Sequence, residues 1–118
     1  MQQIYDRIIT ANGLSAVPIS VESGVLDTCS LACTDRSSIT VTVELLAIVK
    51  NEDELAGVIG HEIAHMLYKD ELKADKQGLL YAKKAGYNYC KAAQFLKNYL
   101  EDDTHPSGAV RYKNSGCP

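Results

Sequence analysis

Three residues between positions 61 and 65 have the types and the spacing that metal-dependent hydrolysis needs. The segment reads His61-Glu62-Ile63-Ala64-His65, which is the HExxH pattern. Residues four apart lie on the same side of a helix, so the two imidazoles can share one metal ion. Zinc binds such nitrogen ligands, and a catalytic site adds a third protein ligand and leaves one position for water. Glu62 adjoins His61, so its carboxylate is predicted to act as general base on that water.

The third metal ligand is expected after the second histidine, where three acidic residues are in range: Asp70, Glu71 and Asp75. Glu71 opens the next predicted helix, and Asp75 follows one turn later on the same face. The small residues Gly78 and Ala82 continue this face, which can therefore approach the metal-binding helix closely. We prefer Glu71 as the zinc ligand and Asp75 as the residue that orients a zinc-binding histidine. The alternative for Asp75 is an exposed carboxylate in a surface salt bridge.

The elements that must position these residues follow from periodicity, turn formers and capping residues. A first amphipathic helix is expected to cover a small sheet, of which the last two strands form a hairpin. Asn51 and Glu54 form a capping-box pattern at the start of the metal-binding helix. The expected elements are a helix at 2–12, three short strands between 17 and 43, and helices at 44–48, 52–68, 71–86 and after Asn88. This order predicts an α+β fold.

Length, charge and apolar content restrict the domain organisation and the partners. The chain has 118 residues and a mass of 12.9 kDa, so we expect a single domain, 1–118, with one modest core. The formal charge of -3, without a basic arm, argues against nucleic acid as a partner. No apolar run reaches the roughly 18 to 20 residues that span a bilayer, and no signal peptide is evident. A cytoplasmic location without a membrane span is therefore expected.

The four cysteines, at positions 29, 33, 90 and 117, are expected to be free thiols, because an intracellular location disfavours disulfides. Two disulfides are the alternative. Cys29 and Cys33 are placed on one strand, where four residues at about 3.3 Å each put them roughly 13 Å apart, beyond disulfide reach.

Three motifs, in the same order, resemble those of the gluzincin metallopeptidases, in particular the family of CAAX prenyl endopeptidases and heat-shock membrane peptidases. KNEDELAGVIGHEIAH is similar to that family's metal helix, and ELKADKQGLLYAKKAGY is similar to its ExxxD helix. The segment from His105-Pro106 to Arg111 is similar to its late His-Pro-x4-Arg segment. The resemblance runs from about residue 4 to residue 112 and implies a zincin-like α+β fold with one Zn²⁺ per chain.

The resemblance also implies a role for each matching residue. His61, His65 and Glu71 become the zinc ligands. Glu62 becomes the general base, and His105 or Arg111 stabilises the developing oxyanion. The implied activity is zinc-dependent endopeptidase cleavage of a peptide or unfolded protein substrate. An edge strand of the sheet is expected to pair with the extended substrate.

The chain departs from this family in size. Family members usually carry a long insertion, often membrane-spanning, between the second histidine and the ligand glutamate, and this chain has none. It is therefore similar to the minimal soluble members called minigluzincins, some of which are held latent by their own C-terminal segments. The cleft-lining strand of the family commonly reads Asn-Ala-aromatic, whereas its equivalent here is expected within Cys29-Ser30-Leu31-Ala32.

The C-terminal tail, residues 101–118, has two interpretations. Its polar, turn-rich composition favours a frayed terminus. The alternative is a strand-like segment that fills the substrate groove and offers the Cys117 thiolate to the open zinc position, which would make the molecule a zymogen. Self-inhibition or oligomerisation through the tail would follow. Two rival functions are a latent zinc-binding protein whose cleft the tail blocks, and a metal-free interaction module.

Overall fold

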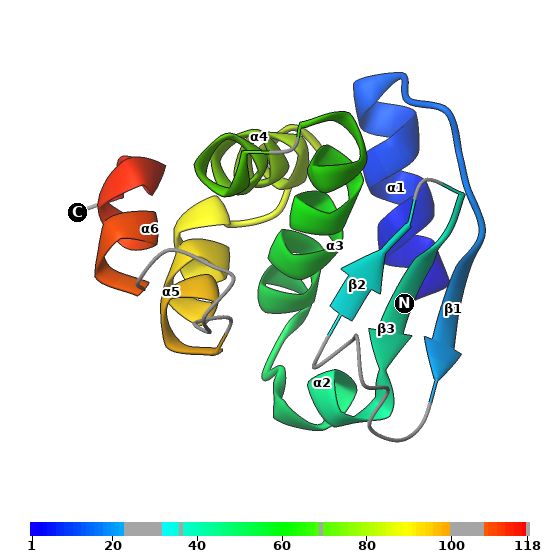
Figure 1. Ribbon diagram of the computed structural model, residues 1–118, viewed down its shortest axis with the longest axis horizontal. Coiled ribbons are helices and arrows are strands. Elements are labelled where there is room, and N and C mark those ends of the chain that lie inside the picture. The colour runs from blue at the N-terminus through cyan, green and yellow to red at the C-terminus, as the bar shows by residue number, and fades with distance from the viewer. Residues whose placement is uncertain (23–31, 36, 69, 100–107, 118) are drawn as a thin grey trace.

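The computed structural model of the chain (Figure 1) describes residues 1–22, 32–35, 37–68, 70–99 and 108–117. Within its helices, the side chains of Glu71, Asn98, Tyr99 and residues 108–111 are not described. The elements in chain order are α1 (Gln2–Asn12), β1 (Ile19–Glu22), β2 (Ala32–Thr34), β3 (Ile39–Thr42), α2 (Val43–Ile48), α3 (Glu52–Leu67), α4 (Glu71–Lys84), α5 (Tyr89–Tyr99) and α6 (Gly108–Ser115). The predicted α+β class is confirmed.

The three strands form one sheet in the order β1-β3-β2. β1 runs parallel to β3, with Val21 opposite Val41, and β2 runs antiparallel to β3, with Ala32 opposite Val41. The predicted pairing of the last two strands is therefore confirmed. Ile39 and Val41 of the central strand are fully buried, because they share the face of β3 that packs into the hydrophobic core. Thr40, on the opposite face, is only partly buried. β1 and β2 are the edges of the sheet.

Helix α3 lies at the centre of the molecule, with the sheet and α1 on one side and α4 and α5 on the other (Figure 1). Every residue from Leu55 to Ala64 is buried. A helix that is apolar or small over most of its circumference is typical of a covered position. α6 lies beyond α5, on the side of the molecule that is farthest from the sheet (Figure 1). The helix that carries the HExxH pattern is thus enclosed by the rest of the fold.

Local side chains define where the two helices nearest the pattern begin. Asn51 Oδ1 accepts a hydrogen bond of 3.0 Å from the Glu54 N–H, and Glu54 Oε1 accepts one of 2.7 Å from the Lys50 N–H. Asp70 caps α4 in the same way, because its Oδ1 accepts a 2.9 Å hydrogen bond from the Lys73 N–H. The Asn51 and Asp70 side chains thus satisfy N–H groups in the first turn of each helix that lack partners within it, and Glu54 holds the Lys50 N–H just before α3. The predicted starts of both helices, at residues 52 and 71, are confirmed.

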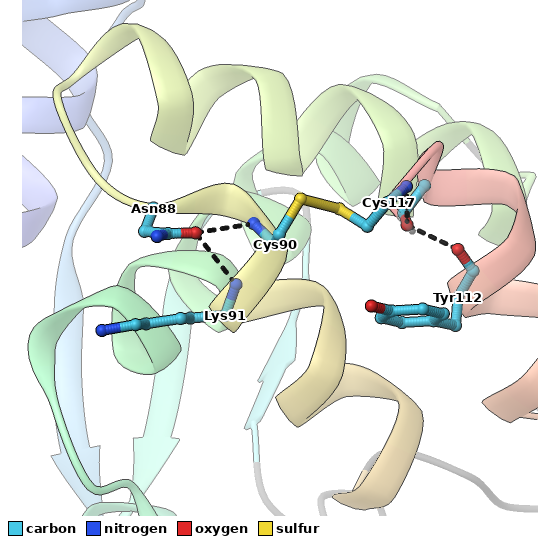
Figure 2. Close-up of a disulfide and its surroundings, with 6 residues drawn as sticks. Asn88, Cys90, Lys91, Tyr112 and Cys117 are labelled. Carbon is cyan, nitrogen blue, oxygen red and sulfur yellow. Dashed lines mark hydrogen bonds between the residues drawn. A yellow bond between two sulfur atoms is a disulfide. The ribbon is translucent and has the colours of Figure 1, made fainter.

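The described part of the tail differs from both interpretations given above, because residues 108–115 form helix α6. Cys117, directly after this helix, forms a disulfide with Cys90 in the first turn of α5, with the two Cα atoms 5.7 Å apart (Figure 2). The prediction of a free Cys117 thiolate is therefore wrong, because α6 packs back against α5 and brings the two cysteines together. Residues 101–107 lie outside the described residues.

The prediction of a free thiol is also wrong for Cys33, because this residue is disulfide-bonded. Cys29 lies outside the described residues, and so does most of the segment 29–32 that was expected to line the cleft; only Ala32, which opens β2, is described. Among the helices that the structure describes, none has the length and apolar content to cross a bilayer.

Candidate metal site

The two histidines of the HExxH pattern lie one turn apart on α3. Their ring centroids are 5.3 Å apart, and the ring planes are inclined by 63°. His61 is completely buried, whereas His65, nearer the end of the helix, is partly exposed. This is the same-side placement that the spacing predicts for two ligands of one metal ion.

Asp75 on α4 contacts the first of these histidines. Its Oδ1 lies 2.7 Å from His61 Nδ1, and the Asp75 side chain is only 2% exposed. A carboxylate accepts hydrogen bonds but cannot donate them, so the hydrogen of His61 belongs on Nδ1 and its Nε2 is the nitrogen suited to bind a metal. The predicted contact of Asp75 with a histidine is confirmed, and its alternative as an exposed surface carboxylate is wrong.

The second histidine has an equivalent partner in the backbone. His65 Nδ1 lies 3.2 Å from the carbonyl oxygen of Tyr68, the C-cap residue of α3. A carbonyl oxygen is also only an acceptor, so the hydrogen of His65 belongs on Nδ1. As in His61, Nε2 is then the nitrogen suited to bind a metal. This role of Tyr68 was not predicted, because a backbone carbonyl has no signature in the sequence.

Two glycines allow α4 to approach α3 closely enough for these contacts. A Cβ at Gly78 would lie 2.5 Å from the His61 backbone nitrogen, 2.6 Å from the Gly60 carbonyl carbon and 2.7 Å from the Gly60 oxygen. A Cβ at Gly60 would in turn collide with the Gly78 carbonyl oxygen. The predicted close approach of the small face of α4 is thus confirmed, and Gly60 is the partner on α3 that sequence reasoning missed.

Two acidic side chains are buried beside the histidines. Glu62 is 4% exposed and follows the fully buried His61 in the sequence. Asp75 is 2% exposed and contacts the His61 ring. Taking carboxylates out of water costs several kcal/mol per ion unless an opposite charge is near. Imidazole nitrogens and carboxylate oxygens are the donors that zinc takes in proteins, so the residues present fit a metal such as zinc.

The remaining predicted residues are only partly described. Glu71 is the first residue of α4, but its side chain is not described. Asp70, the alternative ligand, caps that helix through its side chain. Arg111 lies on α6 without a described side chain, and His105 lies outside the described residues. Among the side chains that are described, no group of three His, Cys, Asp or Glu residues is arranged to hold a metal ion.

Comparison with known proteins identifies one family. Residues 1–72 of the 118 match the model of Peptidase family M48. M48 is a family of metallopeptidases that are typically zinc-dependent, so the expected metallopeptidase relationship is confirmed. The matched region contains the HExxH pattern and extends through Glu71. No curated protein and no solved structure matches the chain significantly.

Proposed function

This chain belongs to peptidase family M48, and on that premise we propose that it is a zinc-dependent endopeptidase of zincin-like fold in a minimal form. The observation that carries the proposal is the engagement of both histidines through Nδ1. His61 meets the Asp75 carboxylate at 2.7 Å, and His65 meets the Tyr68 carbonyl at 3.2 Å. Zinc-binding histidines generally hold their second ring nitrogen on a carboxylate or carbonyl in this way.

One Zn²⁺ per chain is proposed, with His61, His65 and Glu71 as its ligands. When bound, zinc would polarise the peptide carbonyl and lower the pKa of a bound water molecule, so that hydroxide is available as a nucleophile near neutral pH. The start of α4 favours Glu71 over its neighbour, because Asp70 already accepts the Lys73 N–H as helix cap.

Glu62 is proposed as the general base. Its carboxylate takes a proton from the attacking water and passes that proton to the nitrogen of the departing amine as the peptide bond breaks. The position of Glu62 next to His61 and its burial, with 4% of the residue exposed, favour this role over that of a solvated surface carboxylate. His105 and Arg111 are proposed to stabilise the negative charge that develops on the peptide oxygen.

The proposed substrate is an extended peptide or an unfolded protein segment. β2 is an edge strand of the described sheet and lies beside α3, the helix that carries both histidines (Figure 1). An extended chain can pair with such an edge through main-chain hydrogen bonds, largely independently of its side chains.

A latent zinc-binding protein blocked by its tail is the rival proposal. The described part of the tail does not favour it, because α6 lies on the side away from the sheet and Cys117 is bonded to Cys90. The cytoplasmic location is also disfavoured. Disulfides persist in oxidising compartments and are rare in the cytosol, and Cys33, Cys90 and Cys117 are all disulfide-bonded.

The test compares Glu62→Gln with the exposed, matched Glu52→Gln on the same helix, using zinc content and cleavage of a denatured protein. Both variants should retain about one zinc per chain, and Glu62→Gln should lose about 10²- to 10⁴-fold in cleavage. Wild-type cleavage by Glu62→Gln would refute its role as base. A zinc-loaded wild type without any cleavage would favour the latent alternative, and a wild type without zinc would favour the interaction module.

Single alanine variants test the ligand assignment. Glu71→Ala should lose most of its zinc, because it removes a ligand. Asp70→Ala should retain close to one zinc per chain, because it loosens the first turn of α4 but removes no ligand. If only Asp75→Ala lost the metal, the assignment of Glu71 would be wrong. His105→Ala and Arg111→Ala should lower the turnover number without changing zinc content, and unchanged kinetics would exclude them from the reaction.

A further inference from the structure

Helix α6 is held against the rest of the molecule mainly by contacts to residues far away in the sequence. It has eight residues, and an isolated helix of this length is not stable in water. The Cys90–Cys117 disulfide joins its C-terminal end to the start of α5 across 27 residues (Figure 2). Tyr112 packs against the core and lies under the Lys97 ammonium group, 5.2 Å from the ring centroid.

One contact reaches from α6 to the beginning of α4. Asn114 Nδ2 donates a 2.9 Å hydrogen bond to the carbonyl oxygen of Leu72, 42 residues earlier. Leu72 is the second residue of α4 and directly follows Glu71. Asn114 therefore holds the helical turn that contains Glu71, the proposed third ligand.

The first turn of a helix needs external support more than its middle does, because its first four N–H groups have no partner within the helix. In α4 the Asp70 side chain satisfies one of them, that of Lys73. Asn114 does not satisfy another of these N–H groups but adds a second attachment to the same turn, by donating a hydrogen bond to the Leu72 carbonyl oxygen. A ligand in this turn is positioned only as well as the turn itself.

We propose that Asn114 is a positioning residue for the metal site, which fixes the first turn of α4 and with it Glu71, and that the Cys90–Cys117 disulfide keeps Asn114 in place. This proposal rests on the proposed function, in which Glu71 is a zinc ligand. It assigns to the C-terminal helix a supporting role in metal binding, in contrast both to the frayed terminus that the composition favours and to the blocking role given as its alternative.

The test measures the zinc dissociation constant of the full chain by competition with a chromophoric chelator. Asn114→Ala should weaken zinc binding about tenfold, as is usual when a residue behind a ligand is removed. Asn114→Asp, which keeps the size but loses the donor, should do the same. Lys113→Ala, the exposed neighbour on α6, is the matched control and should bind zinc as wild type does.

The disulfide is tested by substitution, because thiol reductants themselves bind zinc. Cys90→Ser/Cys117→Ser should weaken zinc binding as much as Asn114→Ala does. Cys29→Ser/Cys33→Ser is the control, because it leaves the Cys90–Cys117 disulfide intact. It should bind zinc more tightly than Cys90→Ser/Cys117→Ser does. Circular dichroism of every variant at the assay temperature verifies that it is folded before its dissociation constant is compared.

A double-mutant cycle with Glu71→Ala separates positioning from general stability. If Asn114 acts through Glu71, Asn114→Ala should have no further effect on the weak binding that remains in Glu71→Ala. An equal loss in both backgrounds, or wild-type affinity in Asn114→Ala, would overturn the proposal and leave the proposed function intact. A wild type that binds no zinc would overturn the proposed function and this proposal together.

Discussion

Gly78→Ala tests the crossing of α3 and α4, because two physical effects predict opposite signs for the change in stability. Glycine within a helix is about 0.5–1 kcal/mol less favourable than alanine, so helix propensity alone predicts a more stable variant. Packing predicts the reverse. The new Cβ would lie 2.5 Å from the His61 nitrogen and 2.6 Å from the Gly60 carbonyl carbon. Both are backbone atoms of a buried helix that cannot rotate away, so the crossing must open.

The structure gives the size of the effect. Ordinary van der Waals contact starts at 3.4 Å, so the helices must separate by about 0.9 Å at Gly78. The same displacement would lengthen the His61 Nδ1–Asp75 Oδ1 contact from 2.7 Å to about 3.6 Å, beyond hydrogen-bonding range. Overpacking costs about 1–3 kcal/mol, and the lost buried hydrogen bond costs a similar amount. After the gain in propensity is subtracted, a net destabilisation of about 1–5 kcal/mol is expected.

The assay is urea unfolding of the metal-free protein, followed by zinc titration against a chelator. Gly78→Ala should unfold at lower urea and bind zinc about 10- to 100-fold more weakly, since His61 loses its orienting carboxylate. Gly57→Ala is the matched control, because its Cβ would collide with Ala92 of α5, away from Asp75. It should lose stability but keep its zinc affinity. A Gly78→Ala variant more stable than wild type, or equal losses of affinity in both variants, would refute the reasoning.

Three further substitutions give distinct outcomes. Asp75→Asn keeps the shape of the side chain but removes the negative charge next to His61. Zinc affinity, measured by competition with a chelator, should therefore fall about tenfold. An unchanged affinity would contradict the role of Asp75 in orienting His61. Asn51→Ala removes the cap of α3 and should lower the free energy of unfolding by about 1 kcal/mol, measured in urea, without changing zinc affinity. The Ser37 N–H, with further hydrogen bonds from Ser38 and the Ser37 hydroxyl, holds the pKa of Asp35 below its ordinary value. Asp35 therefore stabilises the folded protein at pH values above its unfolded-state pKa, which is near 4, and this stabilisation is lost as the pH falls through the lowered pKa. The difference in free energy of unfolding between wild type and Asp35→Ala should be present at pH 7 and disappear in stronger acid.

Helices α3 and α4 could be predicted because their signals are local. Asn51 and Asp70 cap their helices through backbone groups three residues away, so each cap can be recognised within a single turn of sequence. The contact between His61 and Asp75 spans more sequence, but the helical repeat places Asp75 and Gly78 on one face, and a glycine on that face indicates close packing.

The C-terminal part could not be predicted in the same way, because its structure depends on distant partners. Asn114 bonds to a carbonyl 42 residues away, and Cys117 bonds to a cysteine 27 residues away. Neither partner can be chosen by periodicity or turn chemistry. The expectation of free thiols was derived from the compartment inferred for the protein and not from geometry, so it failed when the helices brought Cys90 and Cys117 together.

The burial of α3 from Leu55 to Ala64 determines how the metal site can open. Amide hydrogens in a helix that is covered on all sides exchange with solvent only when the whole protein unfolds, whereas those near helix ends exchange through local fluctuations. His61 and Glu62 lie in the covered stretch, and Glu71 lies in the first turn of α4. The proposed zinc would therefore exchange through fluctuations near the partly exposed His65 and the first turn of α4, while the amides from Leu55 to Ala64 remain among the slowest to exchange.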